Sequence, residues 1–174
     1  GVAWEPAVVA RRLLSWISHA GMLLDRASAS TYDSIAKSLG EQIVLLSAAW
    51  RLAPAGYDRL LSLTAIVTAD LCIAGQEAQL DSFAPILEAE INRQIQPDGG
   101  HVSRNPGILV ELLLDFMPLS QCFKARGRAP PKALETAIQR ILPMLRFMRL
   151  GDGTLARFNG VSAPSPDALA TVIA

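Results

Sequence analysis

The stretch YDRLLSLTAIVTADLCIAGQEAQLDSFAPILEAEINRQI, residues 57–95, decides the fold, because it joins two helical segments of opposite character. The first, residues 57–74, carries few charges and is expected to lie inside the molecule. Gly75 is well placed to end it in the left-handed backbone conformation. The second, residues 76–95, carries charges such as Glu90 on a polar face and is expected to lie outside. The stretch therefore predicts an antiparallel helical hairpin.

The same rhythm of helix, short loop and helix extends over the rest of the chain. Apolar residues at three- and four-residue spacing predict further helices, over residues 6–24, 30–52, 106–126, 132–150 and from about 166. No sustained pattern of alternating strands and helices is found. The fold class is therefore expected to be all-α, built from antiparallel hairpins. The alternation of largely apolar helices with helices that carry a charged face favours a layered ring or solenoid over a four-helix bundle.

The composition bounds the protein class. The chain has 174 residues, of which 51% are apolar and 18% charged, with 16 basic and 16 acidic residues. A net charge of zero argues against nucleic acid or an anionic membrane as the main partner. The longest apolar run, residues 60–74, contains Asp70 and is too short to span a bilayer. Because the chain starts at Gly1 and ends in TVIA, we expect a piece of a longer protein.

Two cysteines, Cys72 and Cys122, lie in apolar helical stretches and are expected to be small buried side chains. Their spacing and that of the histidines do not match a zinc site. We therefore expect no metal and no cofactor in this chain.

The loop QPDGGHVSRNPG, residues 96–107, concentrates polar and conformationally special residues between two helices. Its glycines permit backbone angles closed to other residues. The loop leads into a helix whose first amides attract anions, and Arg104 adds a planar pair of donors that fits a carboxylate. Asn105 can cap the helix or bind a ligand, and His101 can transfer a proton near neutral pH. These residues are candidates for an anion-binding or catalytic site.

A structural interpretation of the loop stays open beside the functional one. Asp98 followed by two glycines is an ordinary turn, and Asn105-Pro106 is an ordinary helix start. His101 can serve only to hydrogen-bond the loop to itself.

Four segments together resemble the heparinase II/III-like polysaccharide lyase family, in particular its α-proteobacterial members. They are WEPAVVARRLLSWI (4–17), LTAIVTADLCIAG (63–75), PDGGHVSRNP (97–106) and GDGTLARFNG (151–160). The resemblance implies an incomplete α/α toroid, with residues 1–174 forming one helical domain fragment and a C-terminal β-sandwich in the full-length protein. It also implies β-eliminative cleavage of an acidic, uronate-containing polysaccharide of the glycosaminoglycan type, and a periplasmic or extracytoplasmic location.

The sequence departs from the family at its usual catalytic positions. Gly56-Tyr57-Asp58 stands where the family has an Asn-His pair, and Ile108-Leu109 stands where a Tyr-His pair follows the loop. Three possibilities stay open. Tyr57 or His101 acts as the base while Arg104 or Asn105 neutralises the uronate carboxylate; the catalytic residues lie in the expected sandwich; or the protein binds glycan without cutting it.

Three further residues are candidates for substrate binding. Arg12 lies one turn from Trp16, and an indole face stacks on sugar rings while an arginine holds an anion. Asn159 is a candidate for the edge of a cleft. The alternatives are a core role for Trp16, a helix-surface role for Arg12 and a turn role for Asn159. A further hypothesis, from another class, is a helical interaction scaffold with an apolar groove for a partner helix.

Overall fold

The computed structural model describes residues 1–160 and 166–173. Within these ranges every regular element is helical, and extended residues meet only in two isolated β-bridges, Ile95 with His101 and Arg149 with Leu155. The all-α prediction is confirmed. The chain divides into two compact units, residues 1–83 (unit 1) and residues 84–174 (unit 2), which are described separately.

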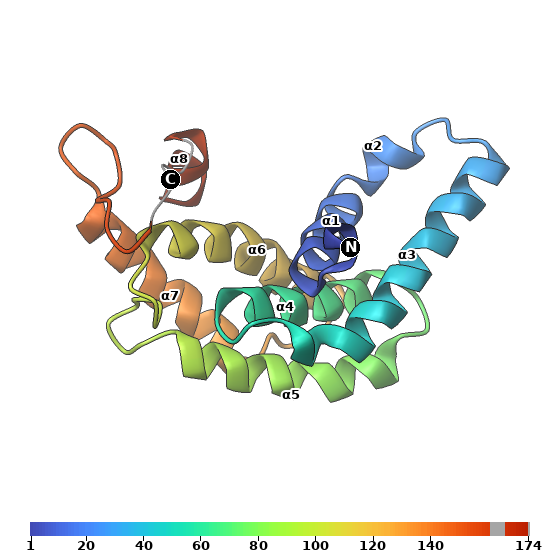
Figure 1. Cartoon of the computed structure of the whole chain (residues 1–174), viewed down its shortest axis with the longest axis horizontal. Helices are drawn as coiled ribbons and strands as arrows, with labels where there is room; N and C mark the ends of the chain where they lie inside the picture. The colour runs from blue at the N-terminus through green and yellow to red at the C-terminus, as the bar shows by residue number, and fades with distance from the viewer. Residues whose placement is uncertain (161–165, 174) are drawn as a thin grey trace. The chain divides into compact units, whose positions relative to one another are not determined.

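Unit 1 is built around one buried helix. Its elements are η1 Val2–Trp4, α1 Pro6–Ser18, α2 Ala20–Leu24, α3 Ala29–Ala49, η2 Trp50–Leu52, α4 Tyr57–Cys72 and the first part of α5 Glu77–Gln94 (Figure 1). α4 packs against α1, and α3 contacts both of these helices. Every residue from Leu60 to Leu71 is buried. The prediction that this segment lies inside is therefore confirmed, because a helix apolar on all sides must be covered on all sides.

Two local details of unit 1 differ from the prediction. The helix expected over residues 6–24 is interrupted at His19, where the backbone leaves the helical region and a new helix, α2, begins at Ala20. α3 begins earlier than expected, since Ser28 is its N-cap: its hydroxyl accepts a hydrogen bond from the Thr31 amide at 3.2 Å. A short polar side chain two residues earlier in the sequence thus satisfies the orphan amide.

Asp70 is a buried carboxyl group within the apolar α4. Its Oδ1 accepts a hydrogen bond from Gln79 Nε2 at 2.9 Å, and the same Gln79 nitrogen lies 3.0 Å from Ser47 Oγ. Asp70 Oδ2 is shielded from solvent and has no hydrogen-bond partner. Burial raises the pKa of Asp70 to about 7, and the hydrogen bond from Gln79 opposes this shift only in part. Through Gln79, Asp70 connects α4 to α5 and α3. Its charged form is destabilised by burial.

Asp70→Asn is expected to stabilise unit 1 above neutral pH and to flatten its pH dependence. Because the folded pKa is raised, folding favours the protonated acid, and stability falls as pH rises from about 4 through about 7. The full shift corresponds to at most about 4 kcal/mol, which solvent screening reduces, and an asparagine buries a new amide donor that costs about 1–3 kcal/mol. We expect a net gain of about 1–2 kcal/mol at pH 8. Thermal unfolding of both proteins between pH 5 and pH 9 measures it, and parallel curves would refute the assignment.

Unit 2 contains the rest of α5 together with α6 Pro106–Ala125, α7 Lys132–Met148 and α8 Pro166–Ile173. α6 packs against α7 and α8, which also contact each other (Figure 1). Among the described residues of unit 2, α6 supplies more of the buried apolar core than any other helix, through Leu109, Val110, Leu112, Leu113, Phe116, Leu119 and Phe123. α6 begins at Pro106, as predicted, because the missing amide hydrogen of a proline costs nothing in the first turn of a helix.

α6 is also the one helix of the described residues that is long and apolar enough to cross a membrane by length and composition alone. Half of its apolar stretch is buried inside the protein, and core helices of soluble proteins share this length and composition.

Two burial predictions are wrong. Glu90, expected on the solvent-exposed face of its helix, is 4% exposed. Its carboxylate pairs with Arg93 at 2.8 Å and accepts a hydrogen bond from Gln94 at 2.6 Å, and these partners offset the cost of burial. Cys72, expected to be buried, is exposed because it is the last residue of α4; Cys122 is partly buried, and neither cysteine forms a disulfide bond.

Candidate functional site

The loop of residues 96–107 is held in unit 2 by its own polar side chains. Asp98 Oδ1 accepts a hydrogen bond from the Gly100 amide at 2.9 Å, and Asp98 Oδ2 accepts one from the Arg104 guanidinium. The hydrogen bond from Arg104 is the main reason why the pKa of Asp98 is lowered. Arg104 itself has φ of 55°, in the left-handed region. Its side chain is half exposed and forms an ion pair with Asp98.

His101 lies inside this loop and is 2% exposed. Its Nε2 lies 2.8 Å from Gln94 Oε1, while Nδ1 accepts a hydrogen bond from the Ser103 amide at 3.1 Å and contacts Ser103 Oγ at 2.7 Å. An Nδ1 that accepts from an amide carries no proton, so the ring is the neutral Nε2–H tautomer. Burial lowers the pKa of His101 below its usual value. In this arrangement the imidazole connects the end of α5 to the loop that leads into α6.

Asn105 and Asn159 complete the same cluster. Asn105 is the N-cap of α6, and its Oδ1 accepts from the Gly107 amide at 2.9 Å. Asn159 Nδ2 donates to the Arg104 carbonyl oxygen at 3.2 Å. The structure therefore brings His101, Arg104, Asn105 and Asn159 close together. Each of them makes a hydrogen bond that shapes the loop, and their roles in ligand binding stay predictions.

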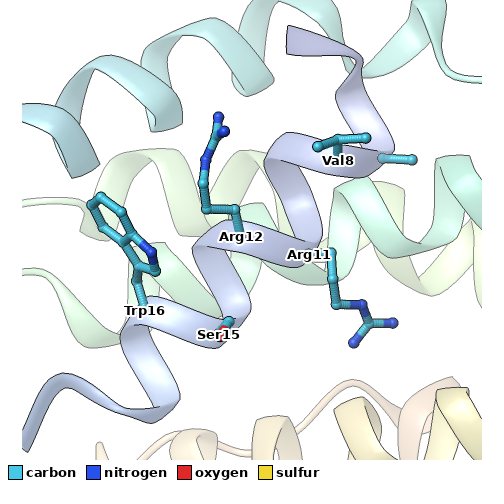
Figure 2. Close-up of a pocket in the computed structure, with 6 residues that line it drawn as sticks. Val8, Arg11, Arg12, Ser15 and Trp16 are labelled. Carbon is cyan, nitrogen blue, oxygen red and sulfur yellow. The ribbon is translucent and has the colours of Figure 1, made fainter. Parts of the chain in front are cut away.

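A different kind of site lies on unit 1. α1 carries an open hollow of about 470 Å³, here called the α1 groove. Its lining residues all come from this one helix; they are Ala7, Val8, Arg11, Arg12, Ser15 and Trp16. Figure 2 shows Arg12 and Trp16 projecting to one side of α1 and Arg11 to the other. α1 contains these two arginines and no acidic residue, and the accessible lining of the groove is largely apolar.

Arg12 is held in place by neighbours from two other segments. Its Nε donates to Gln42 Oε1 at 2.6 Å, and its guanidinium lies over the Trp4 ring, 5.3 Å from the ring centre. Gln42 is 2% exposed and donates in turn to Ser38 Oγ at 3.2 Å. Arg12 Nη2 is shielded from solvent and has no hydrogen-bond partner. The guanidinium is therefore oriented but only partly satisfied.

Tyr57 and Trp16 occupy positions between core and surface. Tyr57 is the first residue of α4, and its hydroxyl oxygen accepts a hydrogen bond from Arg11 Nη2. Trp16 is partly exposed and lines the groove rather than filling the core. Sequence reasoning selected Arg12, Trp16 and Tyr57 but missed Gln42 and Trp4 as the partners of Arg12. Gln42 follows Arg12 by 30 positions, and no local pattern reveals such a pair.

A second open hollow, of about 500 Å³, lies on α3 between Lys37, Gly40, Glu41, Val44 and Leu45. Val44 is 73% exposed, and Lys37 pairs with Glu41 at 4.0 Å. It adds exposed apolar surface to unit 1 but has balanced charge. Among the described residues, no group of three or more histidine, cysteine or acidic side chains could hold a metal ion.

The chain is similar to FtsZ-localized protein C of Caulobacter vibrioides (strain NA1000 / CB15N), with 31% identity over 174 residues. The alignment covers 99% of this chain and 30% of the relative, so the chain spans less than a third of that protein's length. No protein-family model matches the chain. No solved structure matches it.

This similarity overturns the identification with heparinase II/III-like lyases, since the relative is named for its location with FtsZ and no lyase model matches. The lyase activity, the acidic polysaccharide partner, the β-sandwich that the resemblance implied and the periplasmic or extracytoplasmic location are corrected with it. The physical reason lies in the motifs themselves. A Gly-Gly turn, an Asn-Pro helix start and an apolar inner helix are needed by helical hairpins in general.

Proposed function

We propose that this chain is a helical protein-interaction module that acts with the FtsZ division machinery. The observation that carries the proposal is the similarity to FtsZ-localized protein C along 99% of the chain. A module of this kind is expected in the cytoplasm, at the division site. The interaction-scaffold hypothesis drawn from the sequence fits this proposal, whereas the lyase hypothesis does not.

The surface of unit 1 supports an interaction role. It exposes several large apolar side chains, which soluble monomers usually limit to small patches; the most exposed are Val2, Trp4, Met22, Tyr32, Val44 and Leu52. Two open hollows lie on its helices, one on α1 and one on α3. Grooves of this type accept apolar segments of partner proteins.

We also propose that the helical hairpins belong to an incomplete α/α toroid. Within unit 1, α1, α3 and α4 contact one another, and within unit 2 α6 packs on α7. Helices connected by short loops and packed on their neighbours are the units from which curved helical arrays are built. This architecture would present its loops and outer helices to partners.

Binding to purified FtsZ tests the proposal. The 174-residue chain, immobilised through a terminal tag, is expected to bind FtsZ in a saturable manner, as measured by biolayer interferometry. In cells, a fluorescent fusion of the full-length protein is expected to coincide with labelled FtsZ. Bovine serum albumin serves as the protein control. Equal signals for FtsZ and the control, together with a diffuse fusion, would overturn the proposal.

A further inference from the structure

The second half of α7 and the turn that follows it expose four arginines around two large apolar side chains. This surface, here called the α7 end patch, consists of Arg140, Arg146, Phe147, Arg149, Leu150 and Arg157, all of them exposed in unit 2. Phe147 is 85% exposed and Leu150 is 50% exposed, and Phe147 is the most exposed large apolar side chain of the described residues. Exposed apolar side chains with a charged rim are typical of protein-interaction surfaces.

The backbone keeps the members of the patch close together. Arg140 and Phe147 lie two turns apart on one face of α7, because two turns of an α-helix take about seven residues. After α7 the chain turns back on itself (Figure 1), and the Ala156 amide donates a hydrogen bond to the Met148 carbonyl oxygen at 3.0 Å. This hydrogen bond returns Arg157 to the end of the helix.

The patch has an excess of positive charge. Apart from Arg157, its arginines form no ion pair and no side-chain hydrogen bond with any described residue. Arg157 interacts through charge with Asp152. The carboxylate of Asp152 also accepts hydrogen bonds from the amide and the hydroxyl group of Thr154. Residues 140–157 contain these four arginines and Asp152 as their only acidic residue, so most of the positive charge has no counter-ion there.

The helix dipole does not account for this charge. A cation in the last turn complements the partial negative charge at the end of a helix, and Arg146 has this position in α7. Arg140, however, lies about two turns before the helix end, and Arg149 and Arg157 lie beyond it. Neighbouring cations repel one another, and an anionic partner relieves this repulsion.

An acidic protein segment is the ligand that suits the patch. Each guanidinium presents a planar pair of donors that matches the two oxygens of a carboxylate. Arginine and aromatic side chains are enriched in protein interfaces, whereas lysine is depleted, and all four cations of the patch are arginines. An anionic membrane fits less well. Helices that lie on a membrane insert an apolar face, whereas the apolar face of α7, which includes Ala137, Ile141 and Leu145, is buried in the protein.

We propose that the α7 end patch binds an acidic segment of the protein partner, with carboxylates against its arginines and apolar side chains against Phe147 and Leu150. The proposal rests on the interaction role argued above, and it names the surface and the partner chemistry. The charges attract and orient the segment. The two apolar side chains then require a segment in which apolar residues accompany the acids.

Fluorescence anisotropy tests the proposal with a defined probe. The probe is a fluorescein-labelled peptide of twelve residues that contains glutamates, leucines and serines. One control peptide replaces every glutamate by glutamine, and a second replaces every leucine by serine. The 174-residue chain is expected to bind the probe at least about tenfold more tightly than the glutamine peptide, since charge-assisted hydrogen bonds are lost, and at least about threefold more tightly than the leucine-free peptide. Equal affinity for the probe and either control would overturn the proposal.

Variants of exposed residues locate the binding. The double variant Arg140→Gln with Arg146→Gln is expected to weaken binding of the probe at least about tenfold. Its control, Lys132→Glu, makes the same change in net charge at the other end of α7 and is expected to leave binding unchanged. Phe147→Ser is expected to weaken binding at least about threefold, whereas Leu52→Ser, at a site that is 80% exposed in unit 1, is expected to have no effect. Wild-type affinity in either patch variant would reject the site.

The same variants separate this proposal from the proposed function. If the wild-type chain binds FtsZ and the double arginine variant binds it equally well, the patch proposal fails while the FtsZ association stands. If the wild-type chain does not bind FtsZ but binds the probe through the patch arginines, the patch stands and the FtsZ association fails.

Two other occupants have their own outcomes. Phosphatidylcholine vesicles with and without one third phosphatidylglycerol test for a membrane surface. Binding to the anionic vesicles that the double arginine variant loses, together with equal affinities for the probe and the glutamine peptide, would assign the patch to a membrane and contradict the proposal. The full-length protein tests for cover by another part of the same protein. If the 174-residue chain binds the probe and the full-length protein does not, the patch is an internal contact and the proposal is wrong.

Discussion

Gly99→Ala is expected to destabilise unit 2 by more than about 3 kcal/mol. Gly99 has φ of 84°, and a Cβ at this position would lie 2.1 Å from the carbonyl oxygen and 2.7 Å from the carbonyl carbon of Arg140. Both atoms belong to the backbone of α7, so no side-chain rotation relieves the overlap. The left-handed conformation adds about 1–2 kcal/mol for any residue with a Cβ, and forced overpacking adds about 1–3 kcal/mol.

Gly153→Ala is the matched control. Gly153 has the same φ of 84°, but the nearest atom to its Cβ would be Arg149 Nη2 at 3.5 Å, an ordinary contact with a flexible side chain. It therefore isolates the conformational cost, about 1–2 kcal/mol. Thermal unfolding followed by circular dichroism, with hydrogen exchange of peptides from α6 and α7, measures both variants. Similar losses for the two substitutions would show that the loop does not press against α7.

His101→Ala is expected to cost unit 2 about 2–4 kcal/mol. The substitution opens a cavity at a site that is 2% exposed, and it deprives Gln94 Oε1 and the Ser103 amide of their partner. Unsatisfied buried groups cost about 1–3 kcal/mol, and the lost packing adds to this. His19→Ala is the control, since His19 is exposed and its Nδ1 contacts the Ser15 carbonyl oxygen one turn earlier in the same helix; it is expected to change stability by less than about 0.5 kcal/mol.

The stability contributed by His101 depends on pH in the opposite sense to that of Asp70. Because burial lowers the pKa of His101 in the folded state, its contribution is fully present above the usual value of about 6.5 and is lost as pH falls through the folded pKa. Protonation would also place a proton on Nδ1 against the Ser103 amide. Hydrogen exchange of unit 2 between pH 5 and pH 8, corrected for intrinsic rates, is expected to show opening that increases toward pH 5. A His101→Ala variant with the same pH profile would show that another group titrates.

The helices could be predicted from the sequence because their signals are local. Apolar spacing and Pro106 at a helix start predict the elements within a few residues. Gly75 has the predicted left-handed φ of 83°, but it does not end α4, which stops at Cys72 with Ile73 as an extended C-cap. Two nearby serines can each cap the start of α3, so the sequence does not locate this helix end to the residue. The pattern predicts a start at Ser30, whereas Ser28 is the N-cap.

The candidate site residues could be selected by type but their partners could not. His101 is chemically able to transfer protons, yet its contacts with Gln94 and Ser103 make it a neutral connector inside the loop. By type, Arg12 and Trp16 are candidates for binding an acidic sugar, and their roles in ligand binding stay predictions. The motifs of the loop resemble a family signature, although the same residues are also what a tight, buried turn requires.

The sequence by itself determined the all-α class, the order of the helices and the apolar character of α4, since these depend on helix propensity and on apolar periodicity along a few turns of chain. Only the tertiary structure decided that Gln42 orients Arg12 across 30 positions, that Gly99 lies against the backbone at Arg140, and that Asp70 and Glu90 are buried. These contacts join residues far apart in the chain, and their energies come from close packing and desolvation, which a linear pattern does not record.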